Sequence, residues 1–103
     1  MRATVTDDGV VELVGRLDVR GAAAAREALH EALARGDGPL RVDLSGVELL
    51  DATGLGVLVG THRRARLQGR DMVLCDARPR VARLLALTRL DRVIPVERGA
   101  VPA

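Results

Sequence analysis

The chain has 103 residues, of which 48% are apolar, so it is long enough for one domain with a real hydrophobic core. It contains no Phe, Tyr or Trp, which excludes nucleic-acid modules that stack bases on aromatic rings. The net charge is only +2, all 16 Lys-plus-Arg positions are arginine, and the missing lysine excludes a Walker P-loop, a protein-kinase core and a Schiff-base enzyme.

Charge distribution and cysteine content narrow the class of protein further. The arginines are interleaved with acidic residues along the chain, so we expect no direct nucleic-acid partner. Cys75 is the only cysteine and ends the apolar run Met72–Leu74, which predicts a buried side chain, no intrachain disulfide and a reducing compartment. Met1 leads into a strand pattern instead of a signal peptide, and no run approaches the roughly 20 apolar residues of a membrane helix. We expect a cytoplasmic protein without membrane insertion.

A hairpin followed by a helix is predicted at the N-terminus. Residues 1–6 and 10–16 form two strand patterns around the turn sequence Asp7-Asp8-Gly9. A helix follows over residues 21–35, and the glycines and proline of residues 36–39 end it. Its apolar side chains recur at i, i+4, i+7 and i+8, which predicts one buried face made of Ala25, Leu29, Ala32 and Leu33. His30 is expected on the exposed side of this helix.

A strand and a second helix come next. The alternation of apolar and charged residues predicts a strand over Leu40–Leu44, and a long connection separates it from a helix over residues 54–68. Gly69 ends this second helix. We expect it to pack on the core through Leu55 or Leu58, Val59, His62 and Ala65.

Three further elements complete the predicted order. Met72–Cys75 is a strand, Pro79 opens a third helix, and Val93–Val96 is a short edge strand. The order β-β-α-β-α-β-α-β predicts an α/β fold whose mixed sheet combines the N-terminal hairpin with parallel strands and is covered by amphipathic helices. One domain should span residues 1–96, followed by a flexible tail over residues 97–103.

The start of the second helix carries the most informative residues. Asp51 and Thr53 lie where helix caps are found, and backbone amides at such a position favour an anion. Taken alone, Thr53 is typical of a plain helix cap. Gly54 and Gly56 are expected to relieve crowding at the helix start, and Gly60 to let the helix pack closely.

A nucleotide site is the first alternative for this glycine-rich segment. Gly54, Gly56 and Gly60 resemble a degenerate dinucleotide fingerprint, and Asp76 follows about 20 residues later, where a ribose-binding acid belongs. The long connection before Gly54 and the short remaining chain argue against it, so we expect no cofactor.

Enzymatic chemistry is the second alternative. A phosphoaspartate receiver needs a lysine that the chain lacks, and Asp43 is therefore expected to bond nearby backbone. The two histidines, His30 and His62, form no Ser–His–Asp or metal-binding spacing. We expect neither an enzyme nor a metal site.

Several motifs together resemble the STAS domains, in particular the small bacterial anti-sigma factor antagonists. The resemblance covers about residues 5–96, in order. The matching segments are Gly15-Arg16-Leu17-Asp18, Asp43-Leu44-Ser45, Asp51-Ala52-Thr53-Gly54-Leu55-Gly56, Met72–Cys75, Leu84–Leu90 and Val93-Ile94.

The resemblance implies a function for Thr53. In that family the hydroxyl residue at this position is phosphorylated by a kinase that is also an anti-sigma factor. The unphosphorylated antagonist binds the kinase and releases a sigma factor, and a PP2C-type phosphatase restores it. The usual hydroxyl residue before the acceptor is Ala52 here, so only Thr53 is retained. The partner-binding residues implied are Asp18, Asp51, Thr53, Gly54, Leu55 and Asp76.

Two functions remain open on the sequence. One is an anti-sigma factor antagonist that phosphorylation of Thr53 switches off. The other is a STAS interaction module of a transporter or stress-signalling assembly that is not switched.

Overall fold

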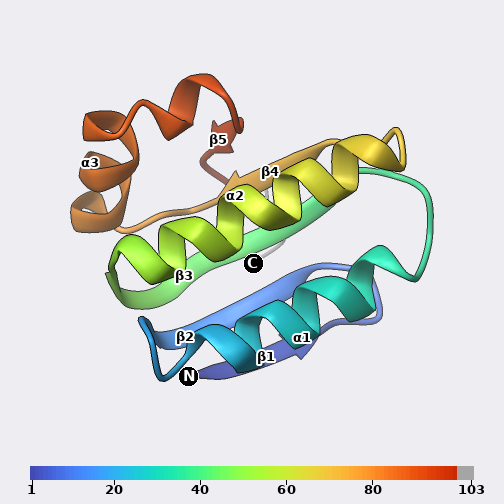
Figure 1. The fold of residues 1–103 in the computed structure, drawn as a ribbon, viewed down its shortest axis with the longest axis horizontal. Helices are drawn as coiled ribbons and strands as arrows, with labels where there is room; N and C mark the ends of the chain where they lie inside the picture. The colour runs from blue at the N-terminus through green and yellow to red at the C-terminus, as the bar shows by residue number, and fades with distance from the viewer. Residues whose placement is uncertain (100–103) are drawn as a thin grey trace.

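A five-stranded sheet in the order β1-β2-β3-β4-β5 organises the computed structural model, which describes residues 1–99 (Figure 1). β1 pairs antiparallel with β2, and the remaining neighbours pair parallel, which confirms the predicted mixed sheet. The elements are β1 (Arg2–Val5), β2 (Val11–Leu17), α1 (Ala22–Leu33), β3 (Leu40–Leu50), α2 (Ala52–Leu67), β4 (Met72–Cys75), α3 (Pro79–Leu87), the 3-10 helix η1 (Leu90–Arg92) and β5 (Val96–Glu97).

The N-terminal hairpin forms at the predicted turn. Gly9 adopts a φ of +83°, a conformation that glycine reaches without steric cost, and its amide donates to the Thr6 carbonyl at 2.9 Å. The Thr6 amide donates in turn to the Val10 carbonyl at 2.8 Å. The turn therefore sets the register that pairs Val5 with Val11.

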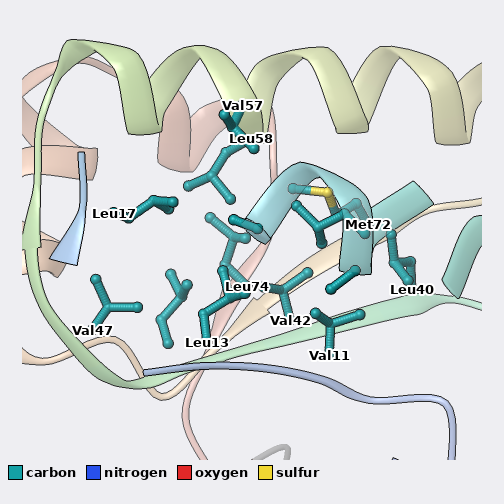
Figure 2. Close-up of a cluster of buried hydrophobic side chains, with 14 of the residues drawn as sticks. Val11, Leu13, Leu17, Leu40, Val42, Val47, Val57, Leu58, Met72 and Leu74 are labelled. Atoms are coloured by element: carbon teal, nitrogen blue, oxygen red, sulfur yellow. The ribbon is translucent and has the colours of Figure 1, made fainter. Parts of the chain in front are cut away.

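Helices α1 and α2 cover one face of the sheet. Figure 1 shows α1 lying over β1 and β2, and α2 lying over β3 and β4, on the same side. All four residues of the predicted face of α1 are buried. Figure 2 shows side chains of α2 meeting those of β2, β3 and β4 in one cluster. The buried residues of α2 are Gly54, Val57, Leu58, Thr61 and Ala65.

The predicted packing face of α2 is therefore partly wrong. Leu58, one of the two alternatives, and Ala65 are fully buried as expected, but Val59 and His62 are only half-buried. Thr61 lies inside instead, because its hydroxyl donates to the Val57 carbonyl at 2.8 Å and needs no water. A threonine whose hydroxyl is hydrogen-bonded within its own helix can thus lie on the buried, apolar face of that helix.

Strand β3 continues to Leu50, so the long connection predicted after Leu44 is wrong. Two register shifts against β2 each add one residue to β3, between the pairs Glu12–Asp43 and Val14–Gly46 and between Gly15–Val47 and Arg16–Leu49. Such bulges break the alternation of apolar and polar residues that marks a strand. Because β3 reaches Leu50, α2 begins at Ala52, two residues earlier than predicted.

The last strand also differs from the prediction. Leu90–Arg92 forms a 3-10 helix, and β5 begins only at Val96. The Pro95 carbonyl accepts from the Leu74 amide, and the Glu97 carbonyl accepts from the Asp76 amide, both at 2.8 Å. Glu97 therefore belongs to the sheet edge. Residues 100–103 of the predicted tail lie outside the described residues, so the division into a domain and a flexible tail remains a prediction.

A buried arginine that sequence analysis missed joins α1 to the start of β4. Arg70 is only 7% exposed, and its guanidinium donates to the carbonyls of Gly38 at 2.8 Å and of Leu33 and Arg35 at 3.1 Å. These carbonyls lie at and beyond the C-terminal end of α1, where helical acceptors lack partners and a positive charge is favoured.

No helix among the described residues is long and apolar enough to cross a membrane.

Candidate functional site

The site forms where β2 and β3 end side by side. Leu17 pairs with Leu50 at the ends of these parallel strands. Asp18 and Asp51 are the next residues after these two, so they lie on neighbouring strand ends. The Asp51 amide donates to the Leu17 carbonyl at 3.4 Å and links the two strand ends. The sheet register thus brings together two of the predicted partner-binding residues that are far apart in the sequence.

Asp51 is the N-cap of α2. Its backbone is extended, with φ −116° and ψ −173°, and its Oδ1 accepts from the Gly54 amide at 3.0 Å. Its carbonyl accepts the first helical hydrogen bond, from Leu55, at 2.9 Å. The predicted capping role is confirmed for Asp51 and wrong for Thr53, which is already the second helical residue.

Thr53 is left free by this arrangement. Its side chain is half-buried, and its hydroxyl makes no hydrogen bond to the described part of the chain. The buried side-chain polar atoms of residues 1–99 are all bonded except Nδ1 of His62, so the Thr53 hydroxyl reaches solvent. The amides of Ala52 and Thr53 have no partner within residues 1–99 either, and they place partial positive charge beside the hydroxyl.

Gly54 is required where α2 crosses the end of β2. A Cβ at this position would overlap the Leu17 carbonyl oxygen and would come within 2.7 Å of Leu50 Cδ1. The expected relief of crowding is therefore confirmed for Gly54. It is wrong for Gly56, and the close packing expected at Gly60 is wrong as well, because both have open space beside them.

Replacing Gly54 by alanine should destabilise the protein by about 1–3 kcal/mol, since the added methyl group has to displace backbone. The matched control is Gly56→Ala in the same helix, which meets nothing and should stabilise by about 0.5–1 kcal/mol through helix propensity. Urea denaturation of both variants measures the difference. Equal denaturation midpoints for the two variants would show that α2 does not pack closely against Leu17 at Gly54.

Asp18 has a structural role that sequence analysis missed. Its Oδ1 accepts from the amides of Arg20 at 3.0 Å and Gly21 at 3.1 Å. Its carbonyl accepts from Gly21 and Ala22, so Asp18 closes the turn that leads into α1. A test of its charge in partner binding should therefore use Asp18→Asn, which keeps the acceptor oxygen.

Asp76 does not lie beside Asp18 and Asp51. Cys75 pairs with Asp43, near the middle of β3, whereas Asp51 follows the far end of that strand. The Asp76 backbone has a φ of +56°, and its Oδ1 accepts from the Gly99 amide. Its part in partner binding stays a prediction, and any such contact would be separate from the one at Thr53.

Asp43, Cys75 and His30 each occupy a position that the fold explains. Asp43 bonds backbone as expected, since its Oδ1 accepts from the Ser45 amide at 2.9 Å. Cys75 is fully buried as expected, and this burial raises the pKa of its thiol. His30 is not on an exposed side as predicted but half-buried between α1 and α2.

An apolar groove of about 200 Å³ adjoins the site. It lies between the end of β3 and α3. Leu50, which precedes the cap Asp51, forms part of its wall, and the partly exposed Leu49 and the exposed Leu87 lie along it. Arg80, Arg83 and Glu48 also line the groove, so its lining carries charges of both signs. Through Leu50, the groove adds an apolar surface next to the start of α2, where Thr53 lies.

A family model described as "Mlab, STAS domain" matches residues 1–96. The chain belongs to the STAS domain family. This STAS domain is 37% identical over 90 residues to an anti-sigma-B factor antagonist of Bacillus subtilis (strain 168), covering 87% of this chain and 82% of that protein.

Two further relatives of the STAS domain are similar over most of their length. An anti-sigma F factor antagonist of Paenibacillus polymyxa is 31% identical over 88 residues, covering 84% of this chain and 75% of that protein. The crystal structure of an anti-sigma factor antagonist from Mycobacterium paratuberculosis has a TM-score of 0.76 and 32% identity, covering 92% of this chain and 83% of that one.

Proposed function

We propose that this STAS domain is an anti-sigma factor antagonist that is switched by phosphorylation of Thr53. Unphosphorylated, it binds an anti-sigma factor that is also a serine/threonine kinase, and a sigma factor is released. Phosphorylation of Thr53 ends the binding, and a PP2C-type phosphatase restores it. The protein acts in the cytoplasm as a regulator and not as an enzyme.

The free hydroxyl of Thr53 carries this proposal. Because Asp51 caps α2, the Thr53 hydroxyl is not engaged in the helix start and is open to another protein. The neighbouring Ala52 has no hydroxyl, so the segment offers a single acceptor. The names of the relatives supply the kind of partner.

The proposed partner surface is centred on the ends of β2 and β3. It comprises the carboxylates of Asp18 and Asp51, the Thr53 hydroxyl and the half-buried Leu55. Gly54 contributes by letting α2 approach Leu17, which fixes the position of Thr53. A side chain of the partner that enters the apolar groove beside Leu50 would extend the same contact.

A second candidate function is a STAS interaction module that is not switched. It is favoured by the description of the matched family model, which names Mlab and no sigma factor. Such a module would use the same surface without phosphorylation. The two functions therefore differ in a chemical event at Thr53.

Intact mass after incubation with the cognate kinase and ATP separates the two functions. The wild-type chain and Thr53→Ser should each gain one phosphate, and Thr53→Ala should gain none. Ser45 is the control site, because it is exposed, whereas Thr61 is buried with its hydroxyl bonded to Val57. Phosphate on Ser45 in the Thr53→Ala variant would refute the assignment, and an unmodified wild-type chain would favour the second function.

A further inference from the structure

A second groove, of about 280 Å³, runs between α1 and α2. Arg26 and His30 of α1 lie on one side, and Arg64 of α2 lies on the other. The remaining lining comes from α2 and consists of Gly56, Val57, Gly60 and Thr61. The two helices lie side by side over the sheet (Figure 1).

The groove holds positive charge without a counter-charge. The ion pairs within residues 1–99 are Arg35–Glu31 and Arg66–Asp71, so Arg26 and Arg64 form none there. No acidic residue of the described chain lines the groove. Burial lowers the pKa of His30, and the guanidiniums of Arg64 and Arg26 lower it further, so both arginines act on the same ring.

The floor of the groove allows a ligand to approach closely. Gly56 and Gly60 are exposed and have open space where a side chain would be. The Thr61 hydroxyl is already bonded to the Val57 carbonyl, so the free donors of the groove are the guanidiniums and the imidazole. Guanidinium groups bind phosphate oxygens in a bidentate manner, which suits a small oxyanion.

We propose that Arg26, His30 and Arg64 form a binding site for a phosphate group, either free phosphate or the phosphate of a small metabolite. The volume is near the lower end of the range for small-molecule sites, roughly 300–1,000 Å³, which favours a small ligand over a nucleotide. Bound phosphate neutralises the two arginines and favours the protonated imidazole of His30.

The site also lies next to the segment that the proposed function uses. Thr53, Gly56 and Gly60 are spaced by three and four residues and share one face of α2. A phosphate beside Gly56 would therefore bring negative charge to about one helical turn from Thr53. This consequence rests on the proposed function, whereas phosphate binding itself does not.

NMR titration of the isolated protein with inorganic phosphate, at constant ionic strength set with chloride, tests the site. The amide signals of Gly56 and Gly60 should shift with saturation, and the pKa of His30 should rise. Binding should weaken at least tenfold in Arg26→Gln and in Arg64→Gln, and it should be unchanged in Arg92→Gln, which removes the same charge from an exposed position outside the groove.

Three results would overturn the proposal. Shifts that do not saturate, or an equal loss in Arg92→Gln, would show diffuse attraction to a basic surface. An unchanged His30 titration would show that phosphate does not enter the groove. Glycerol phosphate added in place of inorganic phosphate distinguishes the two sources, because tighter binding of the ester indicates a metabolite and weaker binding indicates free phosphate.

Discussion

Replacing Leu58 by alanine should lower the free energy of unfolding by about 2–5 kcal/mol. Leu58 is fully buried, and Figure 2 shows its side chain pointing from α2 toward the sheet cluster that contains Leu17. The core contains no aromatic ring, so it consists of aliphatic side chains, most of them Leu and Val, together with Met72. A cavity under α2 would have few flexible neighbours to fill it.

Leu67→Ala is the matched control for this prediction. Leu67 lies on the same helix but is 88% exposed, so its truncation should change stability by no more than about 0.5 kcal/mol. Urea denaturation with a common slope measures both variants. A similar midpoint for Leu58→Ala and Leu67→Ala would show that α2 buries a different face.

The second large effect is expected at Arg70. Arg70→Met keeps a long apolar side chain but removes the donors to the carbonyls of Gly38, Leu33 and Arg35. Hydrogen bonds to a charged group contribute about 1.5–3 kcal/mol each, and water can replace only part of them at this buried position. We expect a loss of about 2–4 kcal/mol, together with faster amide exchange in the last turn of α1.

Arg66→Met is the control, since its ion pair with Asp71 is exposed and contributes only about 0–1 kcal/mol. Thermal denaturation and hydrogen exchange of the two variants provide the comparison. If Arg70→Met is no less stable than Arg66→Met, the end of α1 is satisfied by other groups.

The hairpin and the buried face of α1 could be predicted because their signals are local. A turn sequence with Gly9 lies between two strand patterns, and the apolar residues of α1 recur at helical spacing. The capping role of Asp51 could be predicted for the same reason, because the Gly54 amide that its side chain binds is only three residues away. Each of these features depends on residues close together in the chain.

The errors arise where long-range contacts decide the structure. The bulges of β3 are set by its pairing with β2, and no local pattern marks them. The register of β4 on β3 separates Asp76 from Asp51, although both follow strands. Arg70 is buried because it binds carbonyls more than 30 residues earlier in the chain, and its own neighbours carry no sign of this.

The site at Thr53 also depends on both kinds of contact. The resemblance of the motif around Thr53 to STAS domains implied a phosphorylation site, whereas the adjacency of Asp18 follows from the sheet register and the free Thr53 hydroxyl from the cap at Asp51. The structure also assigns a backbone role to Asp18 and a packing role to Gly54. Substitutions at these two positions therefore test stability as well as partner binding.

Phosphorylation of Thr53 should act locally and leave the fold intact. A phosphate adds about 1.5–2 negative charges, and the start of a helix stabilises such charge by about 0.3–1 kcal/mol. Shifts of backbone amides should then cluster at residues 51–56 and at Asp18, and should spare Asp76, which the register places elsewhere. We expect the added charge to weaken binding, because it would be buried without a partner in the interface.

The dissociation constant of the complex with the anti-sigma factor kinase, measured for the unphosphorylated chain and for the chain phosphorylated at Thr53, tests the central claim most directly. We predict at least a hundredfold weaker binding after phosphorylation, about 2.7 kcal/mol, with an unchanged melting temperature of the free protein. Equal affinities for the two forms would contradict the claim that Thr53 controls partner binding.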